Sequence, residues 1–443
     1  MQEIKKINLS LEKIKTVTLA DVSINNKGEY GIGASAVDYS DELYTYLRIT
    51  DINDDGTLNK NDLKSVDDVD AKNYLLNEND VVFARTGNST GKAYYYDKMD
   101  GELVYAGFLI KFSLDSSKIN PKFMKYYVLS KDYKGWVNSM CTGSTRPNIN
   151  AKMYGNMELI LPPREQQDFL VNILGEIDNK IEINKRINKN LEKTLITIFN
   201  SWFINFENYD NSKWMKIDES YGEIPVDWSV EMLEDYVDFV TGVEPGSKNY
   251  HEKPEPHDIP FLRVGDLGSR DNGVFIDPSL SKNKILKYDD IVLSLDATIG
   301  IVKMGLEGAY STGMRKLVIK NDNINQPFLY CLVKSNRIQR IIETFATGTT
   351  ILHAGKSIKH MNFVLSDKKT MDDFGKIGNP IISIILTNLK EIEYLTNLRD
   401  TLLPKLMSGE IDVSKINCDL ELKYNYMKYL FNQIHTPMSK SVV

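Results

Sequence analysis

The feature that most constrains this chain is an internal repeat, because its two halves carry the same short motifs in the same order. Residues 46–52 (YLRITDI) return as residues 261–267 (FLRVGDL). Three shorter pairs keep this order: 19–22 with 233–236, 79–82 with 289–292, and 142–145 with 347–350. Each half then ends in a long stretch with helical periodicity. Two modules held apart by helices indicate a protein that measures the distance between two sites, and DNA is the double-helical ligand best measured in this way.

Length and composition narrow the class of protein. A chain of 443 residues is long enough for two or three domains. No apolar run approaches the roughly 18 residues of a membrane span, and the N-terminus lacks the apolar core of a signal peptide. Cys141, Cys331 and Cys418 have neither metal-ligand nor disulfide spacing. We therefore expect a cytoplasmic, reduced protein without a membrane partner.

The charge is unevenly distributed. The net charge of −7 argues against non-specific coating of nucleic acid. Acidic residues gather between residues 38 and 80, whereas residues 81–153 hold eleven Lys or Arg against five Asp or Glu. Residues 282–360 hold twelve against six, at the equivalent place in the second half. Chance clustering on solvated surfaces is the alternative, and the recurrence in both halves favours DNA contact over it.

Short β-rich runs and proline-initiated helices predict a mixed α/β domain in each half. In the first half we expect strands at 81–83 and 109–112 and a helix after Pro121. In the second half we expect strands at 291–293 and 317–319 and a helix after Pro327.

Two stretches, residues 164–205 and 368–408, predict long helices. In the first stretch, apolar residues recur three or four positions apart, which is typical of a helix that packs along one face. At about 1.5 Å per residue, this helix is roughly 60 Å long. The residues expected to pack between the helices are Leu170, Leu174, Ile177, Ile181, Leu191, Leu195 and Ile198 in the first, and Ile377, Ile381, Ile385, Leu395 and Leu402 in the second. Asn184 and Asn188 interrupt the first seam, where polar residues pin register.

Neither apolar seam is stable alone in water, so we expect the helices to pack on each other in antiparallel orientation. Packing of each helix only on its own domain is the alternative. Residues 378–380 (GNP) predict a kink or a restart of the second helix, and two separate helices remain an alternative. Gly409 is placed as its C-cap.

The sequence therefore predicts an α+β fold, with two similar mixed α/β domains separated by two long antiparallel, coiled-coil-like helices in a pseudo-twofold repeat. The expected division is a first domain at residues 1–161, a spacer helix at 162–205, a connector at 206–228, a second domain at 229–367, a second spacer helix at 368–410 and a tail at 411–443.

Several short motifs follow one another along the chain. They are LPPREQQ at 161–167, IDNKI at 177–181, LEK at 191–193, IFNSWF at 198–203, GEIPVDW at 222–228 and LRDTLLPKLMSGEI at 398–411. In this order, and with the internal repeat, the chain resembles the specificity subunit of type I restriction-modification enzymes from about residue 19 to residue 413. At the second junction the chain departs from the pattern, because residues 365–368 read LSDK where residues 161–164 read LPPR.

The resemblance implies two target-recognition domains, each reading one part of a split site on double-stranded DNA. It implies that the helices set the gap between these parts and dock two modification subunits, which carry S-adenosylmethionine and methylate adenine. It also implies restriction subunits that supply ATP- and Mg-dependent translocation and cleavage.

A catalytic constellation is not apparent in the sequence. Residues 87–92 (GNSTGK) resemble a phosphate-binding loop, but the glycines are one residue too close and Ala93 replaces the required hydroxyl residue. Residues 31–36 fit a loose dinucleotide fingerprint better explained as a turn, and the five histidines lack zinc spacing. We therefore expect no catalytic residue, metal or cofactor in this chain.

Polar, glycine-containing loops at equivalent places are the candidates for DNA contact, since glycine permits close approach and Arg and Asn can read base edges. In the first domain the candidates are Arg85, Thr86, Asn88, Ser89, Thr90, Lys92, Ser144, Thr145, Arg146 and Asn148. In the second they are Thr298, Arg315, Lys316, Thr349, Thr350, His353, Lys356 and Lys359. Ordinary polar turns are the alternative.

The two sets of loops differ in their reading groups. Arg85 is matched with Ser294, and Arg146 has no matching arginine. We therefore expect half-sites of different sequence. Trp202 and Phe203 are either part of the modification-subunit interface or buried between the helices. A methyltransferase with an unrecognised site and a protein scaffold are the competing functions.

Overall fold

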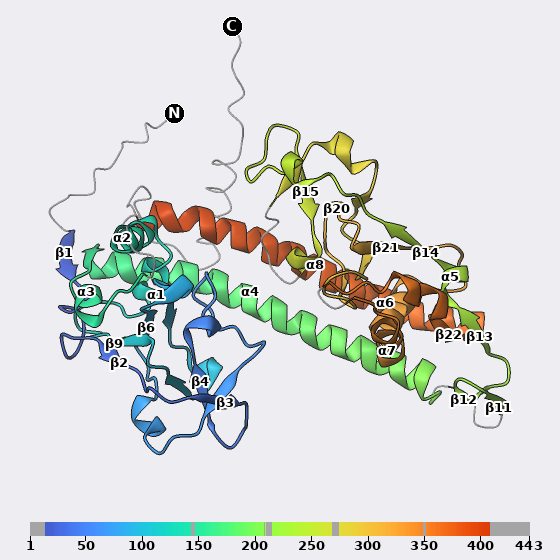
Figure 1. Ribbon diagram of the computed structural model, residues 1–443, viewed down its shortest axis with the longest axis horizontal. Helices are drawn as coiled ribbons and strands as arrows, with labels where there is room; N and C mark the ends of the chain where they lie inside the picture. The colour runs from blue at the N-terminus through green and yellow to red at the C-terminus, as the bar shows by residue number, and fades with distance from the viewer. Residues whose placement is uncertain are drawn as a thin grey trace, which may run out of the picture. The chain divides into compact units, whose positions relative to one another are not determined.

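The computed structural model describes residues 14–142, 147–207, 209, 215–267, 274–348 and 351–407. The chain divides into two compact units: unit 1 contains Met1–Asn179 and Leu395–Val443, and unit 2 contains Lys180–Tyr394. The boundary passes through both long helices, so each unit consists of one mixed α/β domain and a section of each helix (Figure 1). The predicted cap at Gly409 and the tail at 411–443 lie outside the described residues.

Unit 1 contains two four-stranded sheets and a two-stranded ladder. The first sheet is antiparallel, in the order β2 (Glu29–Tyr30), β9 (Leu109–Ser113), β6 (Asp80–Ala84) and β7 (Ala93–Tyr95). The second has the order β3 (Ala36–Asp38), β5 (Lys64–Val66), β4 (Tyr44–Leu47) and β8 (Leu103–Tyr105), and its β4–β8 pair is parallel. The ladder joins β1 (Lys15–Thr18) to β10 (Glu158–Leu161). The helices of this domain are α1 (Phe123–Tyr127), α2 (Lys131–Cys141) and α3 (Ala151–Gly155).

Unit 2 repeats this plan, except that the parallel pair lies at the edge of the second sheet in unit 1 and in the middle of it in unit 2. Its first sheet has the order β14 (Val237–Thr241), β21 (Met314–Ile319), β18 (Ile291–Ser294) and β19 (Val302–Lys303). The second has the order β16 (Phe275–Ile276), β15 (Ile259–Leu262), β20 (Gly308–Tyr310) and β17 (Ile285–Leu286), with a parallel β15–β20 pair. The ladder joins β13 (Ser229–Met232) to β22 (Asn362–Leu365). The four predicted strands and the helices after both prolines are confirmed.

The helices of the second domain are α5 (Leu233–Tyr236), α6 (Gln326–Lys334) and α7 (Asn336–Thr344). The predicted connector contains a hairpin of β11 (Met215–Asp218) and β12 (Gly222–Pro225).

Two small devices recur at equivalent places in the units. Arg48 and Arg263 each form a two-pronged salt bridge to the aspartate three residues later, Asp51 and Asp266, whose carboxylate also accepts the arginine's backbone N–H. A Cβ on Gly31 would come 2.2 Å from the Tyr105 carbonyl oxygen, and one on Gly242 would come 2.1 Å from that of Tyr310. Gly31 therefore belongs to a tight backbone contact, and the assignment of residues 31–36 to a turn is wrong, because the chain is extended there and Ile32 forms a parallel bridge with Ala106.

The two predicted long helices are confirmed. Helix α4 spans Arg164–Phe199 and continues as a π-helical turn, Asn200–Ile204, while α8 spans Lys368–Met407. The alternative of two separate helices in the second region is wrong, because α8 runs without interruption through Gly378 and Pro380. Gly378 instead makes room for a neighbour, since a Cβ there would lie 2.4 Å from Cβ of Pro327 in α6.

Polar side chains fix the register of α4 and α8 in unit 2. The buried Asn184 side chain donates to Oε2 of Glu391 (2.8 Å), and that of Asn188 donates to the Ile385 carbonyl (3.1 Å). The Asn388 amide donates in turn to Oδ1 of Asn188 (2.8 Å). The partner on α8 changes from Glu391 for Asn184 to Ile385 for Asn188. Residue numbers therefore fall along α8 as they rise along α4, which confirms the antiparallel orientation. The predicted role of Asn184 and Asn188 at the seam agrees with these contacts.

Most of the residues predicted for the seam are buried or half-buried, and one is exposed. Leu170, Leu174, Ile177, Ile181, Leu195, Leu395 and Leu402 are buried, and Leu191, Ile198, Ile381 and Ile385 are half-buried. Ile377 is 38% exposed, so its assignment to the seam is wrong. The reason is that α8 buries a different stripe there, Met371, Phe374, Gly378 and Ile382, against the core of unit 2.

Trp202 and Phe203 pack inside unit 2. The Phe203 ring is 3% exposed and lies edge-on to Phe374, with centroids 5.1 Å apart. Trp202 is half-buried and also lies edge-on to Phe374, at 6.0 Å. Phe203 is therefore buried, whereas Trp202 is only half-buried, and the alternative that the pair belongs to a partner interface stays a prediction.

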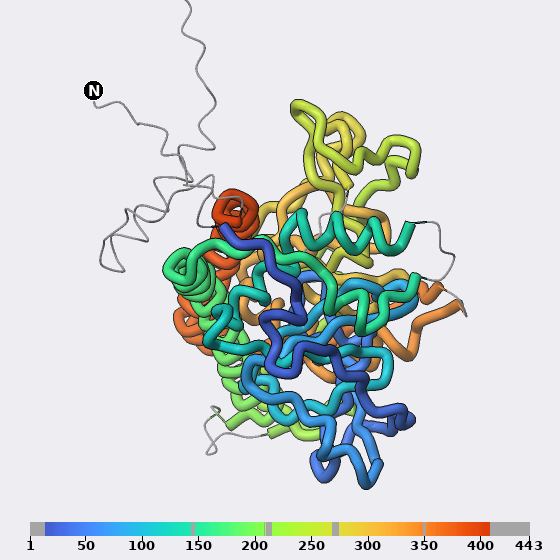
Figure 2. The backbone as a smooth tube through the Cα atoms, turned by 90° about the vertical axis from the view of Figure 1, so that its left-hand side faces the viewer, coloured from blue at the N-terminus to red at the C-terminus, as the bar shows by residue number. Residues whose placement is uncertain are grey.

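In unit 1 the two helices meet at Asp178. The C-terminal section of α8 lies beside the N-terminal section of α4 (Figures 1 and 2), where Arg399 donates to Oδ1 of Asp178 at 3.2 Å. Lys125 and the Tyr126 hydroxyl donate to the other oxygen at 2.8 and 3.0 Å. Burial raises the pKa of Asp178, but Lys125 and Arg399 outweigh it and hold the net pKa below its ordinary value. One carboxylate therefore ties the α1 helix to α4 and α8.

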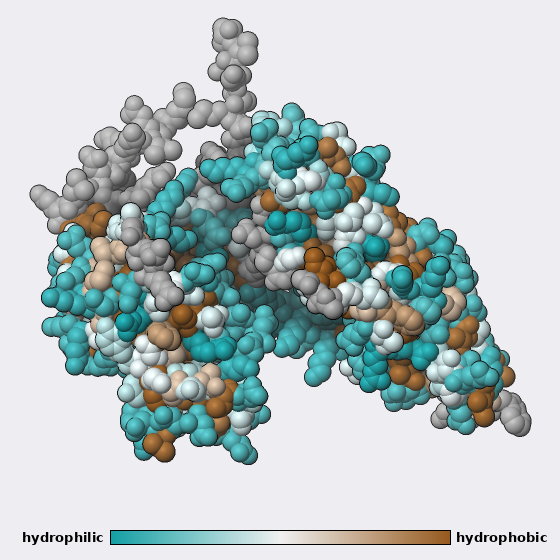
Figure 3. Space-filling view, viewed as in Figure 1, coloured by the Kyte–Doolittle hydropathy of each residue, from teal (hydrophilic) through white to brown (hydrophobic). Residues whose placement is uncertain are grey.

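No helix among the described residues is long and apolar enough to cross a membrane. The face in Figure 3 is mainly hydrophilic, and its hydrophobic residues are scattered.

We predict that Asp178→Asn lowers the free energy of unfolding by about 3 kcal/mol at pH 7, because it leaves Lys125 and Arg399 without their shared carboxylate. Because the pKa of Asp178 lies below its ordinary value, the contribution is present above the unfolded-state pKa of about 3.9 and disappears as pH falls through the folded-state pKa. Urea denaturation at several pH values measures both effects.

The matched control is Asp400→Asn, which removes an exposed carboxylate from the same arginine, Arg399. We expect it to cost about 1 kcal/mol or less. Equal losses from the two variants would contradict the role assigned to Asp178.

Candidate nucleic-acid interface

In each unit, two loops meet in one β-bridge beyond the end of a central strand. The bridge joins Thr86 to Asn148 beyond β6, and Asp296 to His353 beyond β18. The frame around both bridges is the same. The residue after Asn148, Ile149, donates its N–H to the Arg85 carbonyl (2.9 Å), and the residue after His353, Ala354, donates to the Leu295 carbonyl (2.7 Å). Thr86 therefore corresponds to Asp296, and Asn148 corresponds to His353.

This frame corrects one comparison made from the sequence. Arg85 donates its N–H to Phe108 and Leu295 donates its N–H to Gly313, so Arg85 corresponds to Leu295 and not to Ser294. The motifs that the two halves share lie before and after Arg85 and do not include it. Only the backbone pairing therefore shows which residue of unit 2 corresponds to Arg85. Leu295 is fully buried whereas Arg85 is half-buried, so the expectation that the two sets of side chains differ is unaffected.

The first loop of unit 1 is a folded turn tied to its partner loop. Gly87–Ser89 form a 3-10 turn, and the Thr90 hydroxyl donates to the carbonyls of Gly87 (2.7 Å) and Pro147 (3.3 Å). Lys92 is held by Asp54 at 2.8 Å. Asn88 is exposed and Ser89 is half-buried. Since Lys92 is already paired, Asn88 is the more available group for a ligand.

Arg85 lies at the base of this loop with spare hydrogen-bonding capacity. Its guanidinium carbon lies 4.9 Å from the centre of the Tyr30 ring, a cation–π contact. Its Nε is buried and has no hydrogen-bond partner within the described part of the chain. A buried donor without a partner is costly, and a ligand acceptor at this loop would remove that cost.

The second unit carries a different pair at the bridge. Nδ1 of His353 lies 2.7 Å from Oδ1 of Asp296, and the His353 side chain is 61% exposed. The carboxylate holds the ring in one orientation and occupies Nδ1, which leaves Nε2 for a ligand. Ala297, next to Asp296, has a φ of 60°, which is strained for a residue with a Cβ, and its N–H donates to the Leu352 carbonyl (2.9 Å). Thr298 follows it and is exposed.

The predicted cations of the second unit fall into two classes. Arg315 is half-buried and donates to the carbonyls of Thr312 and Met314, and burial lowers its pKa. Lys316 is paired with Asp290 at 2.6 Å. Lys356 and Lys359, on the 3-10 helix Gly355–His360, are exposed and have no ion pair within the described ranges. The two exposed lysines are therefore the better candidates for phosphate contact.

Five predicted DNA-binding residues lie outside the described residues: Ser144, Thr145, Arg146, Thr349 and Thr350. Two contributors were missed by sequence reasoning. Asp296 orients His353, and Tyr30 covers Arg85, and neither contact is visible before the strands are paired.

Comparison with known proteins agrees with the repeated architecture. The family described as type I restriction modification DNA specificity domain matches residues 12–193 and 225–401. The chain is 28% identical over 310 residues to the type I restriction enzyme MjaIX specificity subunit of Methanocaldococcus jannaschii, covering 67% of this chain and 70% of that protein. It is 21% identical to the type I restriction enzyme HindI specificity subunit of Haemophilus influenzae, over 90% of this chain and 99% of that one.

The fold is also similar to a solved structure, the S subunit of a type I restriction-modification system from M. genitalium. The TM-score is 0.53 at 18% identity, and the likeness covers 92% of this chain and 98% of the other.

We predict that the double substitution Lys356→Gln and Lys359→Gln weakens DNA binding by the assembled complex about equally for all sequences. It should make the slope of log affinity against log salt concentration less negative by about two, because two phosphate contacts are lost. Fluorescence anisotropy over a salt series measures this slope. Lys316→Gln, which removes a cation already paired with Asp290, should leave the slope unchanged. An unchanged slope in the double variant would rule out phosphate contact by these lysines.

Proposed function

The chain belongs to the type I restriction modification DNA specificity family, and from this membership we propose that it reads an asymmetric, two-part DNA site. It is the specificity subunit of such a complex and not its catalytic component. Each unit would read one half-site through the loops that meet at its bridge. We propose that this complex acts on DNA in the cytoplasm.

The observation that carries this proposal is the pair of equivalent bridges with different side chains. Unit 1 presents a hydroxyl and an amide, Thr86 and Asn148, and unit 2 presents a carboxylate and an imidazole, Asp296 and His353. An asparagine amide can pair with the edge of adenine, which offers one acceptor and one donor. An imidazole oriented through Nδ1 offers a single nitrogen. The same frame with unlike reading groups supports two half-sites of different sequence.

The paired helices support a role in spacing. Asn184 and Asn188 hold α4 and α8 in one register in unit 2, and Asp178 and Arg399 join the same helices in unit 1. A fixed register would give the gap between half-sites a fixed length. We propose that the chain assembles with two modification subunits, which bind S-adenosylmethionine and methylate adenine. It would also assemble with restriction subunits, which use ATP and Mg. No metal-binding cluster of three or more His, Cys, Asp or Glu occurs within the described ranges.

Methylome sequencing of a host that produces the chain with its modification subunit tests the proposal directly. We expect a split motif whose two parts differ. A palindromic or uninterrupted motif would contradict it.

A second experiment assigns the halves of the motif to the units. His353→Ala should relax one position of one half-site, because a contact worth about 1–3 kcal/mol of base discrimination is removed. Asn148→Ala should relax a position in the other half-site. Sequencing of the methylated sites measures both changes. Relaxation of the same half by both variants, or of neither half, would show that the bridges are not the reading positions.

A further inference from the structure

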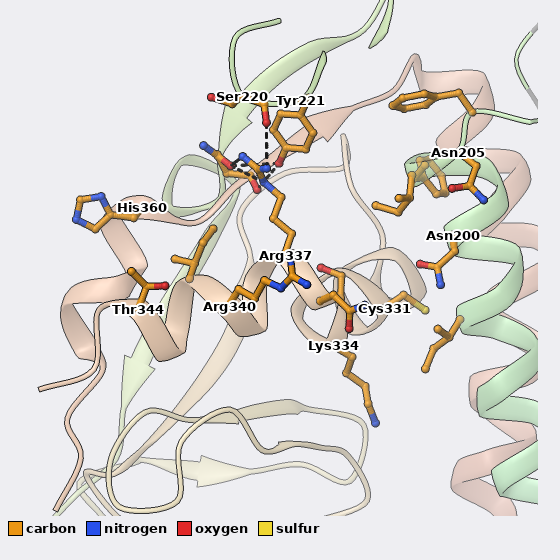
Figure 4. A pocket seen from close by; sticks show the side chains of 18 of the residues that line it. Asn200, Asn205, Ser220, Tyr221, Cys331, Lys334, Arg337, Arg340, Thr344 and His360 are labelled. Atoms are coloured by element: carbon orange, nitrogen blue, oxygen red, sulfur yellow. Dashed lines mark hydrogen bonds between the residues drawn. The ribbon is translucent and has the colours of Figure 1, made fainter. Parts of the chain in front are cut away.

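A cavity of about 830 Å³ lies within unit 2 (Figure 4). Its walls come from the π-helical end of α4, the residues that follow β11, the helices α6 and α7, the start of β22, and His360 at the end of the 3-10 helix Gly355–His360. Apolar side chains from both sides, including Ile196, Phe206 and Ile341, form part of its lining. Its volume falls in the range of about 300–1,000 Å³ that is typical of ligand-binding pockets.

The backbone on one side of the cavity is held in two uncommon conformations. Asn200–Ile204 form a π-helical turn, and Phe206 has a φ of 56°, which is rare for a bulky residue. Both persist because aromatic rings fix them: Phe203 and Phe206 pack on Trp228 with ring centroids 6.0 and 5.5 Å apart. Such conformations gather at functional sites, where the surrounding core determines them. One result is that Ile204 remains 45% exposed at the cavity wall.

The cations around the cavity differ in availability. Arg337 is immobilised, since it stacks on the Tyr221 ring at 3.7 Å and donates to Oδ1 of Asn362 and the Ser220 carbonyl. Lys334 is paired with Glu192. Arg340 is exposed, and its guanidinium points into the cavity with no hydrogen bond or ion pair within the described part of the chain (Figure 4).

Two amides face the same space. The side chains of Asn200 and Asn336 line the cavity, are exposed, and have no hydrogen-bond partner among the residues that the structure describes. Free amides are suited to a ligand that offers both N–H and C=O groups, as a peptide backbone does. The cavity thus combines one free guanidinium, two free amides and an apolar wall, and none of its lining residues is acidic.

We propose that this cavity is a docking site for an acidic polypeptide segment of the modification subunit, with Arg340 binding a carboxylate and the apolar wall taking a neighbouring aliphatic side chain. Arginine pairs with carboxylates through two parallel hydrogen bonds, which suits a planar group entering a recess. DNA is the poorer occupant, because duplex phosphates lie on a convex surface and do not offer apolar groups to an apolar wall. The proposal rests on the proposed function and names the part of unit 2 that meets the partner.

The test compares charge reversal at two places in the full-length chain. Arg340→Glu is combined with purified modification subunit in the absence of DNA, and the dissociation constant is measured by mass photometry or calorimetry. We expect at least tenfold weaker assembly, and a change of threefold or less for Arg340→Lys. The matched control is Lys248→Glu, which makes the same change of charge at an exposed residue of unit 2 outside the cavity. It should assemble like the original chain.

A second arm identifies the carboxylate. Acidic surface residues of the modification subunit are changed one at a time to lysine, and one of them should restore assembly with Arg340→Glu. Arg340→Glu assembling as tightly as Lys248→Glu would overturn the docking site. If Arg340→Glu assembles normally without DNA and loses assembly only when DNA is added, Arg340 would be assigned to DNA contact. This result would also overturn the docking site. If Arg340→Glu assembles normally and directs methylation to the original motif, the docking site fails while the proposed function stands. Failure of the original chain to assemble or to direct any motif would instead refute the proposed function.

Discussion

The structure depends on one constraint, the fixed antiparallel register of α4 and α8. Asn184 and Asn188 occupy positions that an apolar residue would otherwise fill, and this lowers stability. Their hydrogen bonds offset the loss only when Glu391 and the Ile385 carbonyl lie opposite them. A shift of one helical turn would leave the buried Asn184 amide and the half-buried Asn188 amide without these partners, and an unsatisfied buried group costs about 1–3 kcal/mol. Each compact unit also contains a section of both helices, so the two ends of the chain complete one unit. Register is therefore a condition for building both units as well as for pairing the helices.

The two units share backbone features that determine the fold, and they differ in the side chains at their bridges. The strand order of the first sheet, the arginine–aspartate pairs and the crowded glycines Gly31 and Gly242 are the same in both units, because they determine the fold. The side chains at the bridges differ: Asn148 and His353 are exposed and Thr86 and Asp296 are half-buried, so the fold constrains their identity less. The net charge of −7 fits this division. Several cations near the loops are neutralised by internal pairs, such as Lys92 with Asp54 and Lys316 with Asp290, so few remain for phosphates. DNA affinity in the complex would then depend on the modification subunits, and selectivity on this chain.

Much of the fold could be predicted from the sequence because periodicity and repetition report local structure directly. Short runs of consecutive apolar residues marked β6 and β18, and apolar residues three or four apart marked α4 and α8. The errors arose where tertiary contacts decide. Ile377 fits the helical spacing, yet α8 turns Phe374 and Gly378 toward unit 2 because Pro327 approaches there. Arg85 was matched one residue away from its true counterpart because only backbone pairing sets that register. The Asp296–His353 contact and the cavity beside Arg340 join residues far apart in the chain, and no local pattern announces them.

Hydrogen exchange followed by mass spectrometry tests the central claim most directly. The amides of α4 between residues 176 and 190 and those of α8 between 385 and 398 lie where the helices cross from one unit to the other. If the asparagine-pinned pair is the foundation of the structure, these amides exchange as slowly as those of the buried strands β6 and β18. Fast exchange in both segments, while the strands stay protected, would show that the helices separate between the units and would contradict the account.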